Sequence, residues 1–264
     1  MIKKSAVEII ALPAFTDNYI WVLRHAGRVA VVDPGDANPV LEYLAKTGDD
    51  LCAVLITHYH PDHIGGIAEI IAHHPAPVYG PASENIAGVS HPLHGGERIQ
   101  LPEIECEFEI ITLPGHTLGH IAYYDSGLGE AGAVFCGDTL FAAGCGRLFE
   151  GTPTQMLASL NKLAVLPAPT FVYCTHEYTA ANLRFALAVE PENQAIQQRI
   201  AAVAATRAIG GFTVPTRIDL ELETNPFLRS EAPAVRAAAT QRLGHPPRDA
   251  VETFTAIREW KNHF

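Results

Sequence analysis

The sequence predicts an α/β fold followed by a small α-helical domain, and three observations support this prediction. Short apolar, partly β-branched runs recur between residues 6 and 175, as they do in buried strands. Segments with helical spacing lie between several of these runs, which is typical of layered α/β domains. Beyond residue 178 the pattern is mainly helical, with many alanines and glutamines. We therefore expect a catalytic α/β domain over residues 1–177 and a helical domain over residues 178–264.

Turn residues divide the chain into the individual elements. Strands are expected at residues 6–13, 20–24, 28–33, 52–56, 78–80, 98–101, 106–113, 121–124, 133–136 and 170–175. Helices are expected at residues 39–47, 64–73, 154–164, 179–187, 192–208 and 249–263. For the first helix we expect Asn38 as N-cap and Gly48 as the residue that ends it. His91 and His94 lie in a loop rich in glycine and proline, and we interpret them as surface residues.

Composition limits the cellular setting. The 264 residues are 48% hydrophobic, which is enough for a sizeable core. No apolar run approaches the roughly 20 residues that span a bilayer, and the first residues lack the apolar stretch of a secretory signal. The five cysteines are odd in number and contain no CxxC pair, so a disulfide framework is not expected. We therefore expect a cytoplasmic protein that is a monomer and has no membrane partner.

The charge is unevenly distributed between the two expected domains. The formal net charge is −11, which argues against a protein that binds nucleic acid. Residues 1–177 contain 8 basic and 20 acidic side chains, whereas residues 178–264 contain 10 and 9. The arginine-rich C-terminal part is therefore the place where we expect an anionic small-molecule substrate to bind.

The strongest motif is the stretch 57–63, Thr-His-Tyr-His-Pro-Asp-His, which follows an expected strand. Side chains two positions apart point to the same side of an extended segment, so His58 and His60 can hold one metal ion. Asp62 and His63 come after the chain has turned at the proline, and they could hold a second ion. Imidazole and carboxylate together suit zinc and other divalent metals.

Three further potential ligands each follow an apolar strand. They are His116, Asp138 and His176. The ends of such strands can gather at one edge of a sheet, so we expect these residues to complete the metal site. Asp33 is either a turn cap or a carboxylate that accepts a hydrogen bond from a metal-binding histidine. His120 either orients the site or makes an ordinary hydrogen bond.

Five histidines and two aspartates suit two divalent ions. His58, His60 and His116 could hold one ion, and Asp62, His63 and His176 the other. Asp138, with two carboxylate oxygens, is the natural bridge between them. A water held between two ions can ionise near pH 7, and this favours hydrolysis.

These motifs resemble those of a known superfamily. Residues 57–63, 115–116, 137–139 and 175–176 are similar to the metal motifs of the metallo-β-lactamase superfamily. The resemblance implies an αββα sandwich with two metal ions at one edge. Within the superfamily, stretches along the whole chain resemble the hydroxyacylglutathione hydrolase (glyoxalase II) family; they are residues 13–19, 32–35, 137–141, 144–147, 176–178, 225–229 and 258–261.

The family resemblance implies an activity and a set of residues. It implies hydrolysis of the thioester S-D-lactoylglutathione to D-lactate and glutathione by a metal-bridged hydroxide, the second step of methylglyoxal detoxification. Zinc is the expected metal, with iron or manganese as alternatives, and Asp62 and Asp138 are the expected catalytic carboxylates.

The resemblance also implies contacts with glutathione. These would come from Arg147, Tyr178, Arg258 and Lys261. Arg147 stands where many members have lysine, and Phe149 where some have tyrosine, so a hydroxyl contact is missing. Arg258 and Lys261 are three apart and share a helix face. Without the resemblance, a solvated helix face would explain them too.

Two other hypotheses are compatible with the motifs. A phosphodiesterase or nuclease of the same superfamily would share the metals, but the negative charge and the lack of a basic patch weigh against it. A metal-binding or redox module would not hydrolyse anything. An oxygen- or NO-reducing protein would need a flavin domain, and a persulfide dioxygenase would need only one iron.

Overall fold

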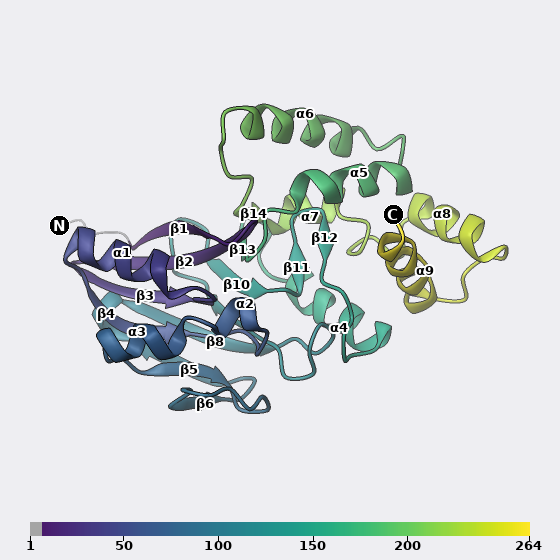
Figure 1. The fold of residues 1–264 in the computed structure, drawn as a ribbon. Coiled ribbons are helices and arrows are strands. Elements are labelled where there is room, and N and C mark those ends of the chain that lie inside the picture. The colour runs from purple at the N-terminus through teal and green to yellow at the C-terminus, as the bar shows by residue number, and fades with distance from the viewer. Residues whose placement is uncertain (1–6) are drawn as a thin grey trace. The chain divides into compact units, whose positions relative to one another are not determined.

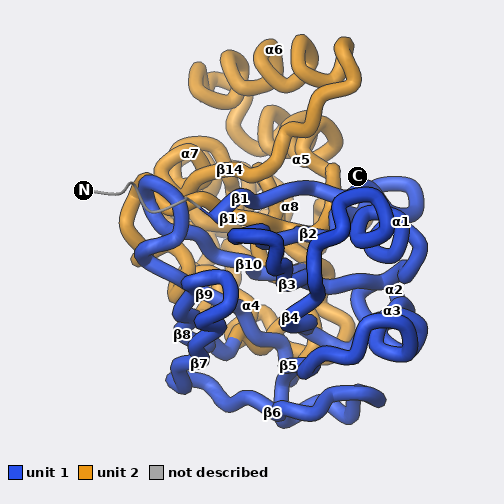
Figure 2. The backbone as a smooth tube through the Cα atoms, turned by 90° about the vertical axis from the view of Figure 1, so that its left-hand side faces the viewer, with its two compact units in different colours: residues 1–112, 119–137 blue, residues 113–118, 138–264 orange. Residues whose placement is uncertain are grey.

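The chain folds into two units whose residues alternate along the sequence. The computed structural model describes residues 7–264. Unit 1 consists of Met1–Thr112 and Gly119–Gly137, and unit 2 of Leu113–Leu118 and Asp138–Phe264, as Figure 2 shows. Residue 6, at the start of the first expected strand, and the N-terminal stretch examined for a signal lie outside the described residues.

A mixed six-stranded sheet forms the first layer of unit 1. Its strands follow chain order: β1 Glu8–Ala14, β2 Asn18–His25, β3 Arg28–Val32, β4 Asp50–Leu55, β5 Val78–Pro81 and β6 His91–Leu93. The first three pair antiparallel, and β3 to β6 pair parallel. Ala26 and Gly27 both have positive φ (48° and 78°) and form a tight turn that connects β2 to β3.

Helices cover one face of this sheet. They are α1 Ala37–Thr47, α2 Pro61–Ile64 and α3 Ile67–His73 (Figure 1). Val40 and Leu44 of α1 and Ile67 and Ile70 of α3 belong to one buried cluster with the valines and isoleucines of β2, β3 and β4. Apolar residues three or four apart therefore place one stripe of each helix on the sheet.

A second, antiparallel layer completes unit 1. It contains β7 Arg98–Leu101, β8 Cys106–Thr112, β9 Ile121–Asp125 and β10 Ala133–Gly137, with the 3₁₀ helix Pro102–Ile104 between β7 and β8. Tyr123 of β9 is fully buried, and its hydroxyl donates to the carbonyl of Ile56 at 2.8 Å. This hydrogen bond satisfies a polar group between the two layers, where an unpaired one would be costly.

Unit 2 is mostly helical. Its elements are β11 Leu140–Phe141, β12 Gly144–Cys145, α4 Pro153–Ala164, β13 Phe171–Cys174, α5 Thr179–Val189, α6 Gln194–Ala208, β14 Thr216–Arg217, α7 Ile218–Thr224, α8 Pro233–Leu243 and α9 Ala250–Asn262 (Figure 1). The N-terminus of α4 has a reciprocal capping box between Thr152 and Gln155, and Pro153 stands at its first position. The expected boundary at residue 177 separates functions, whereas the two units are defined by packing, so the boundary stays a prediction.

Two predictions about helix ends were wrong. The N-cap of α1 is Asp36, whose side chain accepts from the backbone N–H of Asn38, and not Asn38 itself. The helix expected at 64–73 is divided between α2 and α3 at Gly65 and Gly66. A β-carbon on Gly65 would lie 2.5 Å from the carbonyl oxygen of Gly35, so the neighbouring backbone packs directly against this break. The prediction of Gly48 as the helix-ending residue is confirmed by its left-handed conformation.

Several elements were not predicted. They are β6, which contains the exposed His91, the short strands β11, β12 and β14, and the helices α7 and α8. In α8 only Val235 and Ala239 are buried, so the helix has little of the apolar periodicity that sequence analysis detects.

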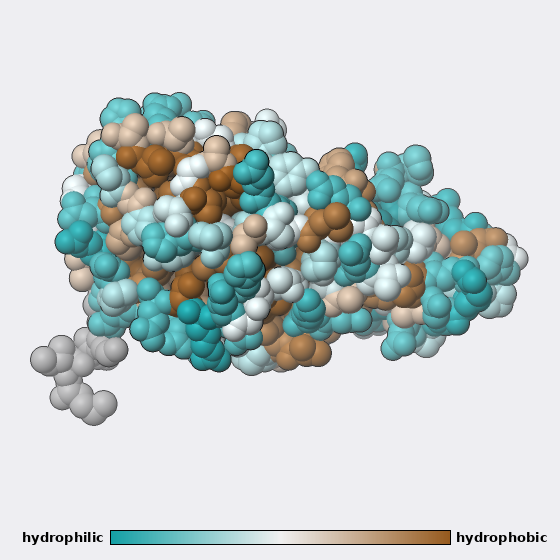
Figure 3. Space-filling view, turned by 90° about the horizontal axis from the view of Figure 1, so that it is seen from below, coloured by the Kyte–Doolittle hydropathy of each residue, from teal (hydrophilic) through white to brown (hydrophobic). Residues whose placement is uncertain are grey.

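The cysteines and the surface complete the description. All five cysteines are free, in agreement with the expectation of no disulfide framework. Among the described helices, none is long and apolar enough to cross a membrane. On the face shown in Figure 3, hydrophobic side chains are interspersed with hydrophilic ones.

Candidate metal centre and substrate pocket

The histidine-rich stretch follows β4, and hydrogen bonds fix its first residue. Thr57 is fully buried; its backbone N–H donates to Asp33 Oδ1 at 2.8 Å and its hydroxyl donates to Asp33 Oδ2 at 2.7 Å. His58 Nδ1 lies 3.1 Å from the same hydroxyl. Because the single hydroxyl proton is used toward Asp33, the oxygen accepts from His58 Nδ1–H. The lone pair of His58 is then on Nε2, the nitrogen available to a metal ion.

Asp33 also supports a second histidine. His63 Nδ1 lies 3.0 Å from Asp33 Oδ2, and both side chains are buried. The carboxylate beside Nδ1 favours the proton on that nitrogen, so the lone pair of His63 is on Nε2. Of the two interpretations of Asp33, the structure therefore supports the carboxylate that holds metal-binding histidines. Asp33 occupies the left-handed region with φ of 51°, a conformation that aspartate tolerates better than most residues.

The proline at residue 61 starts α2 and separates two pairs of side chains. His60 is the extended N-cap of this short helix, and Asp62 and His63 lie within it. Asn18, at the start of β2, donates through Nδ2 to Asp62 Oδ2 at 3.0 Å. One oxygen of Asp62 is therefore held in place. Asn18 was not among the predicted site residues. The only indication of a role was that it lies in the stretch 13–19, which resembles the family.

The two histidines before the proline converge. His58 Nε2 and His60 Nδ1 are 3.1 Å apart. His120, which is fully buried, stacks on the ring of His58 with 4.7 Å between centroids. A β-carbon on Gly137 would lie 2.8 Å from His120 Nε2 and 2.3 Å from Thr57 Oγ1, so only glycine leaves room for these two side chains. His120 thus packs against a potential ligand, which supports the orienting interpretation.

In unit 2, one carboxylate lies between two histidines. Asp138 Oδ2 is 3.4 Å from His116 Nε2, and Asp138 Oδ1 is 3.4 Å from His176 Nε2. All three residues are buried. Asp138 therefore presents one oxygen to each histidine, which is the geometry of a carboxylate that serves two ions.

His116 is oriented from behind by the main chain. Its Nδ1 lies 2.8 Å from the carbonyl oxygen of Arg147, which can only accept, so Nδ1 holds the proton and Nε2 the lone pair. A β-carbon on Gly146 would lie 1.9 Å from the carbonyl oxygen of Asp138 and 3.1 Å from His116 Nδ1. Glycine at this position allows the backbone to approach the main chain of Asp138 and the ring of His116 closely.

These donors fit divalent metal ions. Three histidines (His58, His63 and His116) each have an oxygen within 3.1 Å of Nδ1, which favours the proton on Nδ1 and the metal-binding lone pair on Nε2. Two ring nitrogens as close as those of His58 and His60 can both face a cation. All seven predicted ligands belong to groups of histidines and carboxylates that could hold a metal ion. The chemistry of the donor set is therefore that of a site with two ions.

Unit 2 also has a cavity of about 520 Å³ that includes two of the ligands. Its size is in the range of small-molecule sites. Its lining residues are His116, Asp138, Phe141, Cys145, Arg147, Phe149, Tyr178, Ala181, Asn182, Arg258, Lys261, Asn262 and Phe264. All four residues expected to contact glutathione are in this set.

Two aromatic rings of the cavity lining lie beside predicted metal ligands. The ring of Tyr178 lies parallel to that of His176, with 4.6 Å between centroids and 2° between planes. Phe149 meets the ring of His116 edge-on at 5.2 Å and is 64% exposed. Phenylalanine offers no hydroxyl here, so Phe149 provides an apolar wall beside the ligand.

Three cations face the cavity. Arg258 is buried and donates through Nη1 to the carbonyl of Cys145 at 2.9 Å, while its Nε has no hydrogen-bond partner among the described residues. Lys261 Nζ lies 3.4 Å from the carbonyl oxygen of Ala181. Burial, and then the positive charge of Arg258, lower the pKa of Lys261 to about 8. The exposed guanidinium of Arg147 adds positive charge, so this cavity favours an anion.

Comparisons with known proteins give the class first. The model of the "Metallo-beta-lactamase superfamily" matches residues 14–176, and that of "Hydroxyacylglutathione hydrolase C-terminus" matches residues 177–264. Among solved structures, the B3 metallo-β-lactamase BLEG-1 is 25% identical, with a TM-score of 0.62 over 84% of this chain and 99% of the other. TTHA1623 in a di-iron-bound form is 26% identical, with a TM-score of 0.57 over 84% and 100%. The predicted metallo-β-lactamase-like fold with a C-terminal helical part is thereby confirmed.

The particular family follows from a full-length relative. The hydroxyacylglutathione hydrolase of Pseudomonas fluorescens (strain SBW25) is 51% identical over 261 residues, which cover 98% of this chain and 100% of the relative. This chain belongs to the hydroxyacylglutathione hydrolase family, a family of hydrolases with the metallo-β-lactamase fold. The fold and the histidine and aspartate cluster support the binding of two metal ions.

Proposed function

We propose that this chain hydrolyses S-D-lactoylglutathione, and related S-2-hydroxyacylglutathiones, to D-lactate and glutathione. One observation supports this proposal above the others: the cavity of unit 2 contains both predicted metal ligands and a group of cations. Glutathione has two carboxylates, and the thioester sulfur lies near the middle of the molecule. A pocket that joins cations to a metal site can therefore hold the peptide and place the thioester at the metals.

We propose the seven predicted ligands as the metal site. His58, His60 and His116 would hold one ion, Asp62, His63 and His176 the second, with Asp138 shared. When bound, the two ions acidify a water molecule and polarise the thioester carbonyl. Zinc is our first choice, and a mixed histidine and carboxylate set also accepts iron or manganese.

The side chains of this chain would orient the reactants. Asp33 and Thr57 keep His58 and His63 in the metal-binding tautomer. We assign the catalytic carboxylates as Asp62, restrained by Asn18, and Asp138. Carboxylate oxygens accept hydrogen bonds, which suits the orientation of a water proton toward them.

The cations would bind glutathione. Arg258 and Lys261 lie three positions apart on α9, and both line the cavity with Arg147. A guanidinium such as that of Arg258, with a buried N–H still available, is suited to a carboxylate. Tyr178, whose ring is fixed against His176, would contact the peptide part.

The broader setting is proposed on the same grounds. We assign catalysis to residues 1–177 and substrate binding to residues 178–264; the two family models meet at residues 176 and 177. The five free cysteines favour a reducing cytoplasm. The net charge of −11 favours a small-molecule substrate over nucleic acid, and we propose a monomer that acts in methylglyoxal detoxification without a membrane partner.

A substrate panel tests the proposal. Purified protein would be given S-D-lactoylglutathione, a nucleic-acid phosphodiester and glutathione persulfide in parallel. We expect release of glutathione and D-lactate in equal amounts from the first, and no turnover of the others. Phosphodiester cleavage or persulfide oxidation without thiol release would contradict the assignment.

A further inference from the structure

The hairpin of β11 and β12 in unit 2 forms part of the cavity wall. Leu140 pairs with Cys145 and Phe141 with Gly144. Phe141 and Cys145 line the cavity, and Ala143 at the turn has φ of 56°. A two-residue turn of apolar residues has little internal means to hold such a backbone conformation. The hairpin must therefore be fixed by other parts of unit 2.

Asn225, the residue that ends α7, bonds to both strands of the hairpin. Its Nδ2 donates to the carbonyls of Gly144 at 2.9 Å and Phe141 at 3.2 Å. Its Oδ1 accepts from the N–H of Phe227 at 3.1 Å, which fixes the orientation of the amide. Asn225 is fully buried, so these groups have no access to water.

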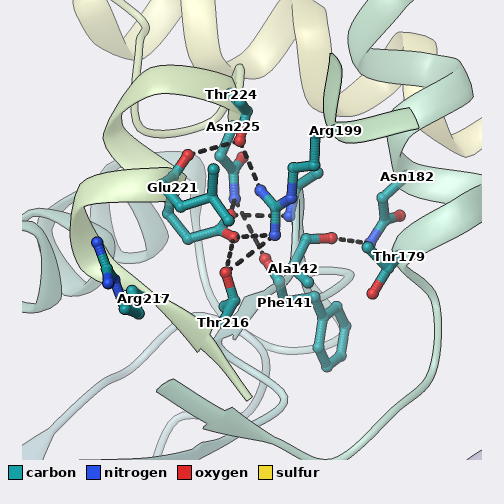
Figure 4. A network of polar contacts seen from close by, with 12 residues as sticks. Phe141, Ala142, Thr179, Asn182, Arg199, Thr216, Arg217, Glu221, Thr224 and Asn225 are labelled. Atoms are coloured by element: carbon teal, nitrogen blue, oxygen red, sulfur yellow. Dashed lines mark hydrogen bonds and ion pairs between the residues drawn. The ribbon is translucent and has the colours of Figure 1, made fainter. Parts of the chain in front are cut away.

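Glu221 holds the turn itself. Its Oε2 accepts from the backbone N–H of Ala143 at 2.8 Å and from Asn225 Nδ2 at 2.9 Å. Its other oxygen accepts from Arg199 at 2.6 Å and from the hydroxyl of Thr216 at 2.6 Å. Figure 4 shows these side chains converging on the carboxylate from α6, α7 and β14.

Two further hairpin carbonyls are held in the same manner. Asn182 of α5 donates to the carbonyl of Ala142 at 3.0 Å, and Arg258 of α9 donates to that of Cys145. The carbonyls of residues 141, 142, 144 and 145, and the N–H of residue 143, thus all bond to side chains outside the hairpin. Because these five backbone groups are all held from outside, the hairpin is restrained to one position.

Stability alone gives a weak reason for this arrangement. The side chains of Arg199 and Glu221 are 6% and 0% exposed, so both charges are removed from water. A well-packed apolar group can often replace a buried ion pair without loss of stability. The carboxylate of Glu221, however, accepts hydrogen bonds from Ala143 and Asn225. An apolar residue could neither accept these bonds nor orient the group that does.

We propose that Glu221, Asn225 and Arg199 are positioning residues for the substrate pocket. Arg199 and Thr216 orient Glu221, and Glu221 and Asn225 hold the hairpin, so that Phe141, Cys145 and the following Arg147 stand where glutathione binds. This inference rests on the proposed function. In this proposal the buried network supports the affinity for the glutathione part of the substrate. The metal ligands determine the rate of the chemical step.

Steady-state kinetics of Asn225→Ala and Glu221→Gln test the proposal. Each variant removes or weakens hydrogen bonds to the hairpin, and we expect KM for S-D-lactoylglutathione to rise about tenfold. We expect kcat to change by less than about threefold, because no residue that contacts the reacting atoms is altered. Metal analysis should still give the wild-type metal content.

Arg217→Ala is the matched control. Arg217 is exposed, donates through Nε to Asp219 at 3.0 Å, and is drawn apart from the network in Figure 4, although it is next to α7. We expect wild-type KM and kcat from it. If either network variant does not fold, Thr216→Val, which removes one hydrogen bond to Glu221, should raise KM by about threefold.

The outcomes separate the two proposals. Unchanged KM in the folded network variants, with an active wild type, overturns the positioning role and leaves the proposed function intact. A loss of kcat at unchanged KM, or a loss of metal, also overturns it, because the network would then support the chemical step. A metal-loaded wild type that releases no thiol overturns the proposed function and this inference with it.

Discussion

The stretch 57–63 and the hairpin of β11 and β12 contribute to the proposed site in opposite ways. In the first, side chains with metal-binding chemistry project from a loop, and neighbouring groups such as Asp33 and Thr57 orient them. In the second, the side chains are small or apolar, and the backbone itself is the group that is held. The stretch 57–63 thus contributes the side chains suited to metal binding. The hairpin contributes backbone that side chains from several helices hold in position.

This contrast leads to separable effects of mutation. Changes in or behind the ligands should act on metal content and kcat. Changes in the cavity and its supports should act on KM. Changes elsewhere should act on stability alone.

The largest effect is expected from Asp138→Ala. Asp138 offers one oxygen to each of two histidines, so its loss should remove the shared ligand. We expect a fall in kcat/KM of about 10³-fold or more and less than the wild-type metal content. Metal analysis and thioester hydrolysis measure both. Asp219→Ala, which alters a half-buried aspartate of the same unit, is the control, and full metal content with full activity in Asp138→Ala would refute the ligand assignment.

Asp33→Asn tests the support behind the histidines. An amide cannot accept with both atoms, so its NH2 group would face either the backbone N–H of Thr57 or the two groups now at Oδ2, the Thr57 hydroxyl and His63. We expect metal affinity to fall about 10–100-fold, while KM measured at saturating metal stays close to wild type. Competition with a chelator gives the affinity. An unchanged affinity would mean that Asp33 serves the turn alone.

Lys261 gives a test by pH on the side of substrate binding. Its pKa is lowered to about 8, mainly by burial, so the side chain is charged below this pH and loses its charge as pH rises. Only the charged form attracts a carboxylate, so KM should be constant below about pH 7 and rise above about pH 8.

Lys261→Arg is the control for that profile. Arginine stays protonated, and KM should then rise far less between about pH 7 and pH 9. This variant also corrects for titration of the substrate amine. A wild-type profile identical to that of the arginine variant would show that Lys261 does not bind the substrate anion.

The smallest effect is expected at the capping box of α4. Thr152→Ala removes the hydroxyl that accepts from the N–H of Gln155. We expect a loss of about 1 kcal/mol in the free energy of unfolding. Denaturant unfolding would measure it, and kcat and KM should not change. A change in KM would contradict this expectation, because it would show that the N-terminus of α4 affects the cavity.

The predictable part of the site consists of residues with distinctive chemistry. Histidines and aspartates after apolar strands could be recognised because strand ends gather and because few other roles explain such a cluster. The family resemblance located Arg258 and Lys261, and both line the cavity as expected. The fold class could be predicted because strand periodicity is strong in unit 1, where one face of the first sheet is covered by helices.

The unpredicted part depends on contacts between distant positions. Arg258 and Cys145 are 113 residues apart, and Asn225 and Phe141 are 84 apart. Nothing in a stretch such as Asn225-Pro226-Phe227 shows which carbonyl its amide will meet. Local choices were also close: Asp36 and Asn38 are both good N-caps, and only the extended backbone at Asp36 decides between them. No local pattern pairs Arg199, on an expected helix, with Glu221, which lies on the unpredicted helix α7.

A metal titration of the metal-free protein tests the central claim most directly. Zinc would be added stepwise, and hydrolysis of S-D-lactoylglutathione would be followed at each step, with wild type and Asp138→Ala in parallel. The account predicts that wild-type activity appears with added zinc and reaches its plateau at two equivalents per chain, while Asp138→Ala stays inactive. Full activity without metal, or a plateau at one equivalent, would contradict it.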